Sequence, residues 1–275
     1  SSSSAASDVY KRQVPPAATT AALAASAAES ARATAAAVAL ATAAAALRRR
    51  SRRRSGTFAE VIASHLLSGG QVGEAFPMLL VAAETTLRGG RNRQTVKLLE
   101  KAERARSKAG AEVGEVERTR YDRRLYALWG TVHFRMGAHR KSLEAWRESL
   151  DSARAEGDKE AIARAQAGMG LARVEMGEIV AASSGLEQAL ARLPQGDPMW
   201  AMAAESLAGA RLSRGDIEGA NRLWVELLEL GREMGEGAVH ARSMVGLGLI
   251  NFVQGRISQG RDSLENAVFR MREQS

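Results

Sequence analysis

The strongest constraint on the fold of this chain is a pattern of small residues that returns about every 40 residues. Three segments carry two glycines seven positions apart, and in a fourth segment alanine replaces the first glycine. The four segments are WGTVHFRMG (129–137), MGLARVEMG (169–177), LAGARLSRG (207–215) and LGLINFVQG (247–255). Their second glycines lie at positions 137, 177, 215 and 255, which gives spacings of 40, 38 and 40 residues. A period of this length is typical of stacked helix pairs, because one pair cannot bury its apolar face alone.

The residues after each second glycine repeat as well. A small residue comes five positions later and a bulky one four positions after that: the small ones are Ser142, Ala182, Ala220 and Gly260, and the bulky ones are Trp146, Leu186, Trp224 and Leu264. We expect the second glycine to end the first helix, since glycine adopts positive φ at little cost. The small residues should then lie where two helices cross, and each bulky residue should fill the groove toward the next unit. Glu178 and Asp216 directly follow two of the glycines, where an acid complements a helix N-terminus.

This arrangement resembles the tetratricopeptide repeat, whose pattern is W-x2-L-G-x2-Y followed by Gly, Ala, a bulky residue, Ala and often Pro. In the second segment, seven residues fall on this pattern: Met169, Gly170, Gly177, Ala182, Leu186, Ala189 and Pro194. The period is longer than the 34 residues of that repeat. Its Trp and Tyr positions hold the pairs Tyr126/His133, Gln166/Arg173, Ala204/Arg211 and Met244/Asn251. The resemblance implies an all-α fold, a right-handed α-solenoid of antiparallel helix pairs, with four such units over residues 111–275.

Residues 57–110 carry the same spacing in a looser form, and we expect repeat-like helices there too. Glycines at positions 70 and 90 each precede a small residue by five positions and a leucine by nine. Residues 65–105 are similar to the segment after the ATPase module of signal-transducing NTPases with numerous domains, and to helices of bacterial kinase- or cyclase-linked regulators and maltose-regulator-type activators. The resemblance implies a piece of a larger bacterial signalling protein, with covalently linked ATPase, kinase or DNA-binding domains outside this sequence. We also expect a truncated C-terminus, because no polar capping helix follows the last unit.

The first 56 residues differ in texture from the rest of the chain. Ser3–Gln13 (SSAASDVYKRQ) resembles the translation of a transposase-based sequencing-library adaptor, so we expect residues 1–13 to be an artefact. Residues 14–56 are low in complexity and rich in Ala and Arg, with too few large aliphatic side chains to bury a core. We expect this segment to be disordered, loosely helical or read in a shifted frame. It is also too weakly apolar to span a membrane.

The basic charge of the chain is concentrated in that leading segment. Residues 1–56 hold nine of the 39 Lys and Arg residues and two of the 31 acidic ones, which accounts for +7 of the net charge of +8. A face that binds nucleic acid would leave an excess of positive charge in the repeats themselves. The run RRRSRRR (48–54) fits a basic arm, but we expect any binding of nucleic acid to vanish without residues 1–56.

No part of the sequence has the spacing of a catalytic or metal site. The chain has no cysteine, which excludes disulfides and thiolate ligands, and its four histidines lie singly at positions 65, 133, 139 and 240. RGGRNRQT (88–95) lacks the spacing of a phosphate-binding loop, and GLGLI (246–250) lies within a helical pattern. We therefore expect no enzyme activity, no catalytic residue, no metal and no cofactor.

The resemblance also implies where a partner binds, since the first helix of each unit lines the concave face of such a solenoid. The candidate residues are Arg124, Thr131, Phe134, Arg135, Arg164, Leu171, Val174, Met202, Glu205, Leu212, Arg242, Leu249 and Phe252. Arginines mixed with apolar residues suit an acidic or amphipathic peptide. In the alternative, which stays open, Leu171, Leu212, Leu249 and Phe252 belong to the core and the arginines only solvate the surface.

The function that follows is a cytoplasmic protein-interaction and regulatory scaffold in bacterial signal transduction, with a protein or peptide as its partner. The alternative is a stand-alone adaptor or chaperone-like repeat protein that binds acidic or amphipathic peptides. Neither reading involves a membrane or nucleic acid.

Overall fold

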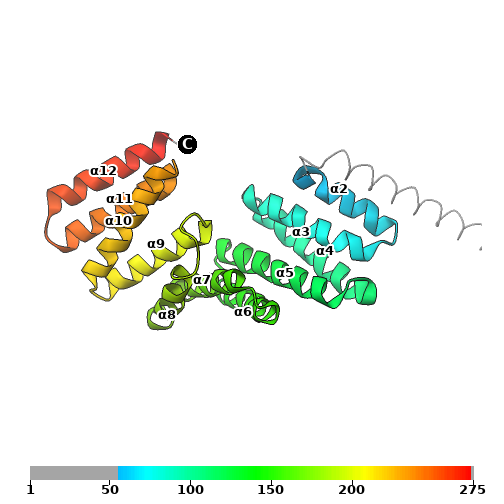
Figure 1. Cartoon of the computed structure of the whole chain (residues 1–275). Helices are drawn as coiled ribbons and strands as arrows, with labels where there is room; N and C mark the ends of the chain where they lie inside the picture. Colours follow the sequence, from blue (N-terminus) through cyan, green and yellow to red (C-terminus); the bar gives the residue numbers. More distant parts are fainter. Residues whose placement is uncertain (1–54, 274–275) are drawn as a thin grey trace, which may run out of the picture.

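The computed structural model describes residues 55–273, and this part of the chain is built of helices without any strand (Figure 1). The predicted all-α fold is therefore confirmed. The elements are α2 (Ser55–Ser68), α3 (Val72–Arg88), α4 (Asn92–Ala109), η1 (Gly110–Glu112), α5 (Glu115–Arg135), α6 (His139–Glu156), α7 (Lys159–Glu175), α8 (Ile179–Leu190), α9 (Pro198–Ser213), α10 (Ile217–Glu233), α11 (Gly237–Val253) and α12 (Ile257–Glu273). The adaptor-like residues and nearly all of the low-complexity segment lie outside the described residues.

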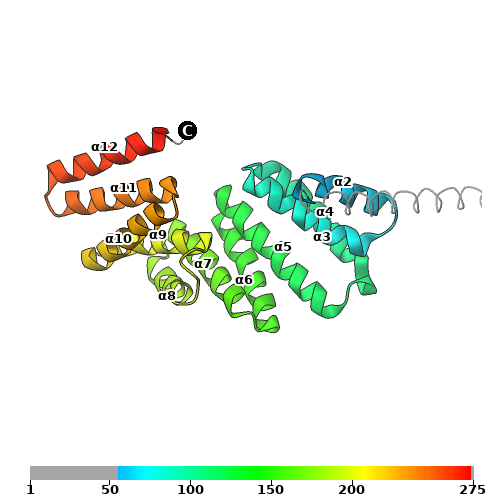
Figure 2. The same ribbon diagram turned by 45° about the horizontal axis from the view of Figure 1, so that its top comes forward.

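The helices stack in chain order into a curved row, with α2 near one end and α12 at the other (Figures 1 and 2). Each of α3, α5, α7, α9 and α11 packs most closely on the helix that follows it or on the one before it. The first helices α7 and α9 also contact each other directly, as do α9 and α11. The result is a solenoid in which helix pairs contact mainly their neighbours.

Glycines in a left-handed conformation form most of the turns. Gly137, Gly157 and Gly177 have φ angles of 73°, 68° and 78°. After α7 the amide of Gly177 donates to the carbonyl of Val174, and the amide of Glu178 donates to the carbonyl of Arg173, both at 2.9 Å. These bonds satisfy carbonyls that the helix end would leave unpaired. The predicted role of the second glycine as a helix terminator is confirmed.

The same turns account for the long period. Helices α6, α7 and α11 have 18, 17 and 17 residues, so that a helix and its short turn together take about 20 residues and a pair about 40. Helix α8 is shorter, with 12 residues, and a loop leads from it to Asp197, whose carboxylate accepts a hydrogen bond from the amide of Met199 at 2.8 Å. Asp216 caps α10 in the same way, through the amide of Gly219 at 2.9 Å, whereas Glu178 makes no side-chain cap bond.

Small residues lie where the two helices of a pair cross, as the spacing predicts. The hydroxyl of buried Ser142 donates to the carbonyl of Gly130 at 2.7 Å, which brings α6 against α5. A Cβ atom added to Gly130 would lie 2.6 Å from Nε1 of Trp146, and one added to Gly170 would lie 2.6 Å from Cδ2 of Leu186. Neither crossing has room for a larger side chain.

Two of the four bulky residues, Trp146 and Trp224, pack against the next unit as expected, whereas Leu186 and Leu264 lie close to Gly170 and Gly248 of their own units. A Cβ atom on Gly168 would overlap the indole of Trp146, and one on Gly246 would overlap the indole of Trp224. Both tryptophans are buried, and each thus connects a second helix (α6, α10) to the following first helix (α7, α11). The core forms one large cluster over α2–α5 and another over α7–α11, and a smaller cluster around Trp146 lies between them.

Candidate functional site

The predicted concave-face residues lie on α5, α7, α9 and α11, the first helices of the four units. Their arginines are not free cations. The guanidinium of Arg124 donates to both carboxylate oxygens of Glu84 on α3, at 2.5 and 2.6 Å. Arg242 donates to Glu205 on α9 at 2.9 Å, so that two of the predicted residues pair with each other.

Arg164 on α7 is also paired with carboxylates of this chain. Its Nε donates to Asp197 at 2.8 Å, and its terminal nitrogen also contacts Glu160 one turn earlier in α7. Asp197 thus caps α9 and accepts from Arg164 at the same time. These ion pairs connect one first helix to the next along the solenoid, and they compensate the positive charge of the face.

The predicted apolar residues divide between core and surface. Leu171 is buried, and Val174 and Leu212 are half-buried against the core cluster of α7–α11. Phe252 is half-buried, whereas Met202 is 38% exposed and Leu249 is 46% exposed. Leu171 therefore faces the core, as the alternative reading has it, and Leu249 does not.

The three remaining candidates make contacts within the first unit or with α3. Thr131 donates to the carbonyl of Ala127 in its own helix at 2.9 Å. The ring of Phe134 meets His139 edge to face, with centroids 5.5 Å apart. Arg135 donates to the carbonyl of Leu87 at 2.5 Å, at the C-terminal end of α3, where a positive charge is favourable.

Sequence reasoning named Glu205 but missed Glu84 and Asp197, the other two acidic partners, although a signal for Glu84 exists. Glu84 lies 40 residues before Arg124, which is one full period, and Glu205 lies 37 residues before Arg242. Opposite charges one period apart on the first helices therefore indicate ion pairs between neighbouring units. Asp197 has no such regularity, because the shortened α8 and its loop shift its position.

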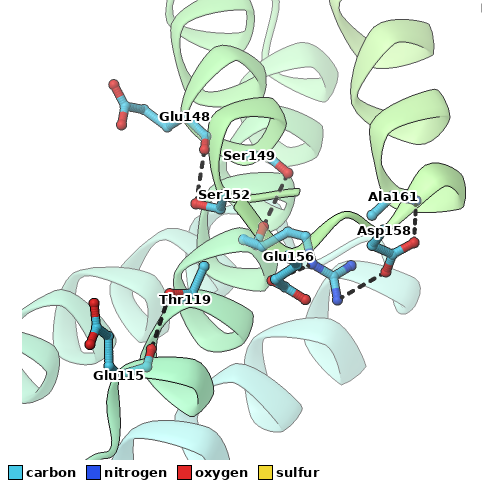
Figure 3. Close-up of polar contacts among 9 residues, drawn as sticks. Glu115, Thr119, Glu148, Ser149, Ser152, Glu156, Asp158 and Ala161 are labelled. Atoms are coloured by element: carbon cyan, nitrogen blue, oxygen red, sulfur yellow. Dashed lines mark hydrogen bonds and ion pairs between the residues drawn. The ribbon is translucent and has the colours of Figure 1, made fainter. Parts of the chain in front are cut away.

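A second polar cluster holds α5, α6 and α7 together (Figure 3). Arg123 on α5 donates to Glu156 at 3.0 Å and lies 3.5 Å from Asp158, which caps α7 through the amide of Ala161 at 3.0 Å. The hydroxyl of Ser149 donates to the carbonyl of Arg123 at 3.2 Å. The acids at this end of α6 are therefore engaged in holding the helices.

Among residues 55–273, no helix has the length and apolar character of a membrane span. The same residues contain no group of three or more His, Asp or Glu side chains that could hold a metal ion.

The comparisons with known proteins agree on the architecture. No protein-family model matches the chain, and no curated protein matches it in sequence. Among solved structures, BtubC (BKLC) from P. vanneervenii is similar with a TM-score of 0.58 at 18% identity, over 83% of this chain and 92% of that one. The apo form of RapI has a TM-score of 0.57 at 11% identity, over 80% and 93% of the two chains.

A putative kinesin light chain from Podosopora anserina with nearly identical TPR-like repeats has a TM-score of 0.51 at 16% identity, over 71% of this chain and 94% of that one. At these identities the comparisons concern the fold alone. Together with the helix pairs, the glycine turns and the crossings of small residues, they identify the fold of this chain as a tetratricopeptide-like α-solenoid.

Proposed function

We propose that this chain is a protein-interaction scaffold without catalytic activity, which binds an amphipathic helix or peptide of another protein on the face of its first helices. The observation that carries the proposal is a set of exposed aliphatic side chains on the neighbouring helices α9 and α11. Met202, Leu249 and Val253 are 38%, 46% and 61% exposed. Exposed apolar side chains on adjacent helices suit the apolar face of a partner helix.

The ion pairs favour an amphipathic partner over a strongly acidic one. Arg124, Arg164 and Arg242 each already pair with a carboxylate of this chain. An acidic tail would have to displace those carboxylates, which offsets much of the gain from a new ion pair. The apolar face of an amphipathic partner can pack on Met202, Leu249 and Val253 without breaking any of these ion pairs.

A peptide-display selection on the full chain tests this proposal. We expect selected peptides to carry apolar residues at helical spacing, and their affinity to fall at least about tenfold in a Leu249→Asp variant, because a charge would enter an apolar contact. Val225→Asp is the matched control, since Val225 is 38% exposed on the second helix α10. Selected peptides that bind the wild type and both variants equally would contradict the proposed face.

We further propose that the scaffold belongs to a larger cytoplasmic signal-transduction protein of bacteria, linked to an ATPase, kinase or DNA-binding domain. The support is the resemblance of residues 65–105 to the segment after the ATPase module of signalling NTPases. The flanking DNA tests it: an adjoining reading frame for such a domain supports the proposal. Stop codons close by on both sides would favour the alternative, a stand-alone adaptor.

A further inference from the structure

A groove opens between α4, α5 and α6, on the side of α5 opposite Arg124 and Thr131. It has a volume of about 350 Å³. Its lining consists of three aromatic side chains from α5, one carboxylate from α4, and a lysine, an alanine and two carboxylates from α6: Tyr126, Trp129, His133, Glu103, Lys141, Ala145, Glu144 and Glu148.

The aromatic floor follows from helical spacing. Tyr126, Trp129 and His133 stand at positions i, i+3 and i+7 of α5, which places them on one side of the helix. Arg124 and Thr131 lie about half a turn away, on the opposite side. Trp129 and His133 stack with centroids 4.9 Å apart and an angle of 16° between their planes, so that they form one extended aromatic surface.

Three carboxylates surround this floor without partners of their own. Within residues 55–273, the side chains of Glu103, Glu144 and Glu148 make no hydrogen bond and no ion pair, in contrast to Glu156 nearby. Figure 3 shows the carboxylate of Glu148 pointing away from the polar cluster that holds Glu156 and Asp158. Against these three negative charges the groove holds one lysine, Lys141.

The protein already places a guanidinium beside this surface. Arg106 on α4 lies over the ring of Tyr126, with Cζ 5.8 Å from the centroid, while both of its ends donate to Asp122. At the positions that Tyr126 and His133 occupy in this unit, the other three units have the pairs Gln166/Arg173, Ala204/Arg211 and Met244/Asn251. The aromatic surface is thus a property of the α5/α6 unit alone among these four.

We propose that this groove binds an arginine side chain of a partner protein. A guanidinium stacks on aromatic rings and donates to carboxylates at its edge, which matches a floor of indole, phenol and imidazole with three unpaired glutamates at the rim. Lysine fits less well, because its compact ammonium cannot stack. The site is independent of the proposed peptide-binding face, since it lies on the other side of α5 and uses none of the same residues.

The test follows the indole ¹H–¹⁵N signal of Trp129 in the full chain while the peptide acetyl-Gly-Ser-Arg-Ser-Gly-amide is added. We expect a saturable shift at peptide concentrations on the order of 1 mM, an affinity to which ring stacking and the contacts with the three carboxylates both contribute. The same peptide with citrulline in place of arginine keeps the shape and removes the charge, and it should give no shift. Equal shifts with both peptides, or none with arginine, would overturn the proposal.

Variants separate the groove from general electrostatics. Replacing Glu103, Glu144 and Glu148 by Gln should weaken arginine binding at least about tenfold. The control replaces three exposed glutamates of α10, Glu218, Glu229 and Glu233, by Gln. It changes the net charge by the same amount as the groove variant. A control that loses as much affinity as the groove variant would refute the site. Tyr126→Phe should retain binding and Tyr126→Leu should weaken it several-fold, since only phenylalanine keeps the ring.

The chain itself offers a competing occupant, the six arginines of residues 48–54. A variant with these arginines changed to serine is therefore titrated in parallel. Equal shifts in both chains support a partner's arginine as the occupant. Shifts that arise only in the serine variant would show that the chain's own segment fills the groove, and the proposal would then fail.

Discussion

Each second helix packs on the first helix of the next unit, but two of these junctions do so differently. One is the junction between α6 and α7, and the other is the junction between α4 and α5. Where α6 meets α7, the indole of Trp146 packs on Gly168 and is buried. Trp224 packs on Gly246 in the same way, between α10 and α11. Where α4 meets α5, the helices pack less extensively. A salt bridge connects them, in which Nε and Nη2 of Arg106 donate to the two carboxylate oxygens of Asp122 at 2.5 and 2.7 Å.

The difference begins in the length of the connection. Gly90 and Gly137 are 47 residues apart, seven more than one period, and the extra residues form η1 and lengthen α5 to 21 residues. Glu112 of this segment accepts a hydrogen bond from the amide of Gly73 at 2.9 Å, at the start of α3. The junction with the insertion thus leaves the aromatic side chains of α5 only half-buried, whereas the regular junctions bury Trp146 and Trp224.

The largest effect is expected at the junction between α6 and α7. Gly168→Leu should lower the free energy of unfolding by about 3 kcal/mol, because the new side chain collides with the buried indole of Trp146. Urea unfolding followed by circular dichroism measures it. Gly209→Ala is the control, since a Cβ atom there meets nothing within 4 Å, and it should stabilise α9 by up to about 1 kcal/mol. A loss below that of an ordinary surface change at Gly168 would show that this junction is not tight.

The turns at the two junctions should respond differently to asparagine. Gly157, before α7, has φ 68° and ψ 18°, a left-handed conformation that asparagine adopts. Gly110, directly after α4, has φ 47° and ψ −121°, which only glycine adopts readily. Alanine at either position should cost about 1–2 kcal/mol. Asparagine should restore stability at position 157 alone in thermal unfolding, and rescue at both positions would contradict these backbone angles.

The salt bridge of the junction between α4 and α5 should contribute less. Asp122→Asn should lower the stability by about 1 kcal/mol, because a half-buried guanidinium loses a charged partner. A double-mutant cycle with Arg106→Met isolates the pair, and we expect most of the loss to disappear in the Arg106→Met background. Additive losses would mean that the two side chains act separately.

The smallest effect concerns pH. Burial, with help from Lys141, lowers the pKa of His133 below its ordinary value of 6.5. The unfolded chain therefore binds a proton more readily than the folded one, and stability contributed by His133 is present above pH 6.5 and is lost as the pH falls below it. His133→Asn should reduce the loss of stability between pH 7 and pH 5. An unchanged pH profile in this variant would contradict the partial burial of the imidazole.

The comparison also separates what the sequence can predict from what it cannot. The crossing of Ser142 with Gly130 and the glycine turn at Gly177 depend on spacing within one unit, so the pattern predicts both. The contact of Trp146 with Gly168 crosses between units, and Gly168 resembles any small helical residue until the stacking is known. The groove depends on how α4, α5 and α6 pack around the seven extra residues, which spacing alone does not give.

The central claim is that solvent reaches the aromatic side chains of α5, including Trp129, whereas Trp146 and Trp224 at the regular junctions are buried. Incorporation of 5-fluorotryptophan gives one ¹⁹F signal for each of the four tryptophans of the chain, and a soluble nitroxide broadens those that solvent reaches. The account predicts that Trp129 is broadened first, and that Trp146 and Trp224 keep narrow lines. Equal broadening of all three, or protection of Trp129, would contradict it.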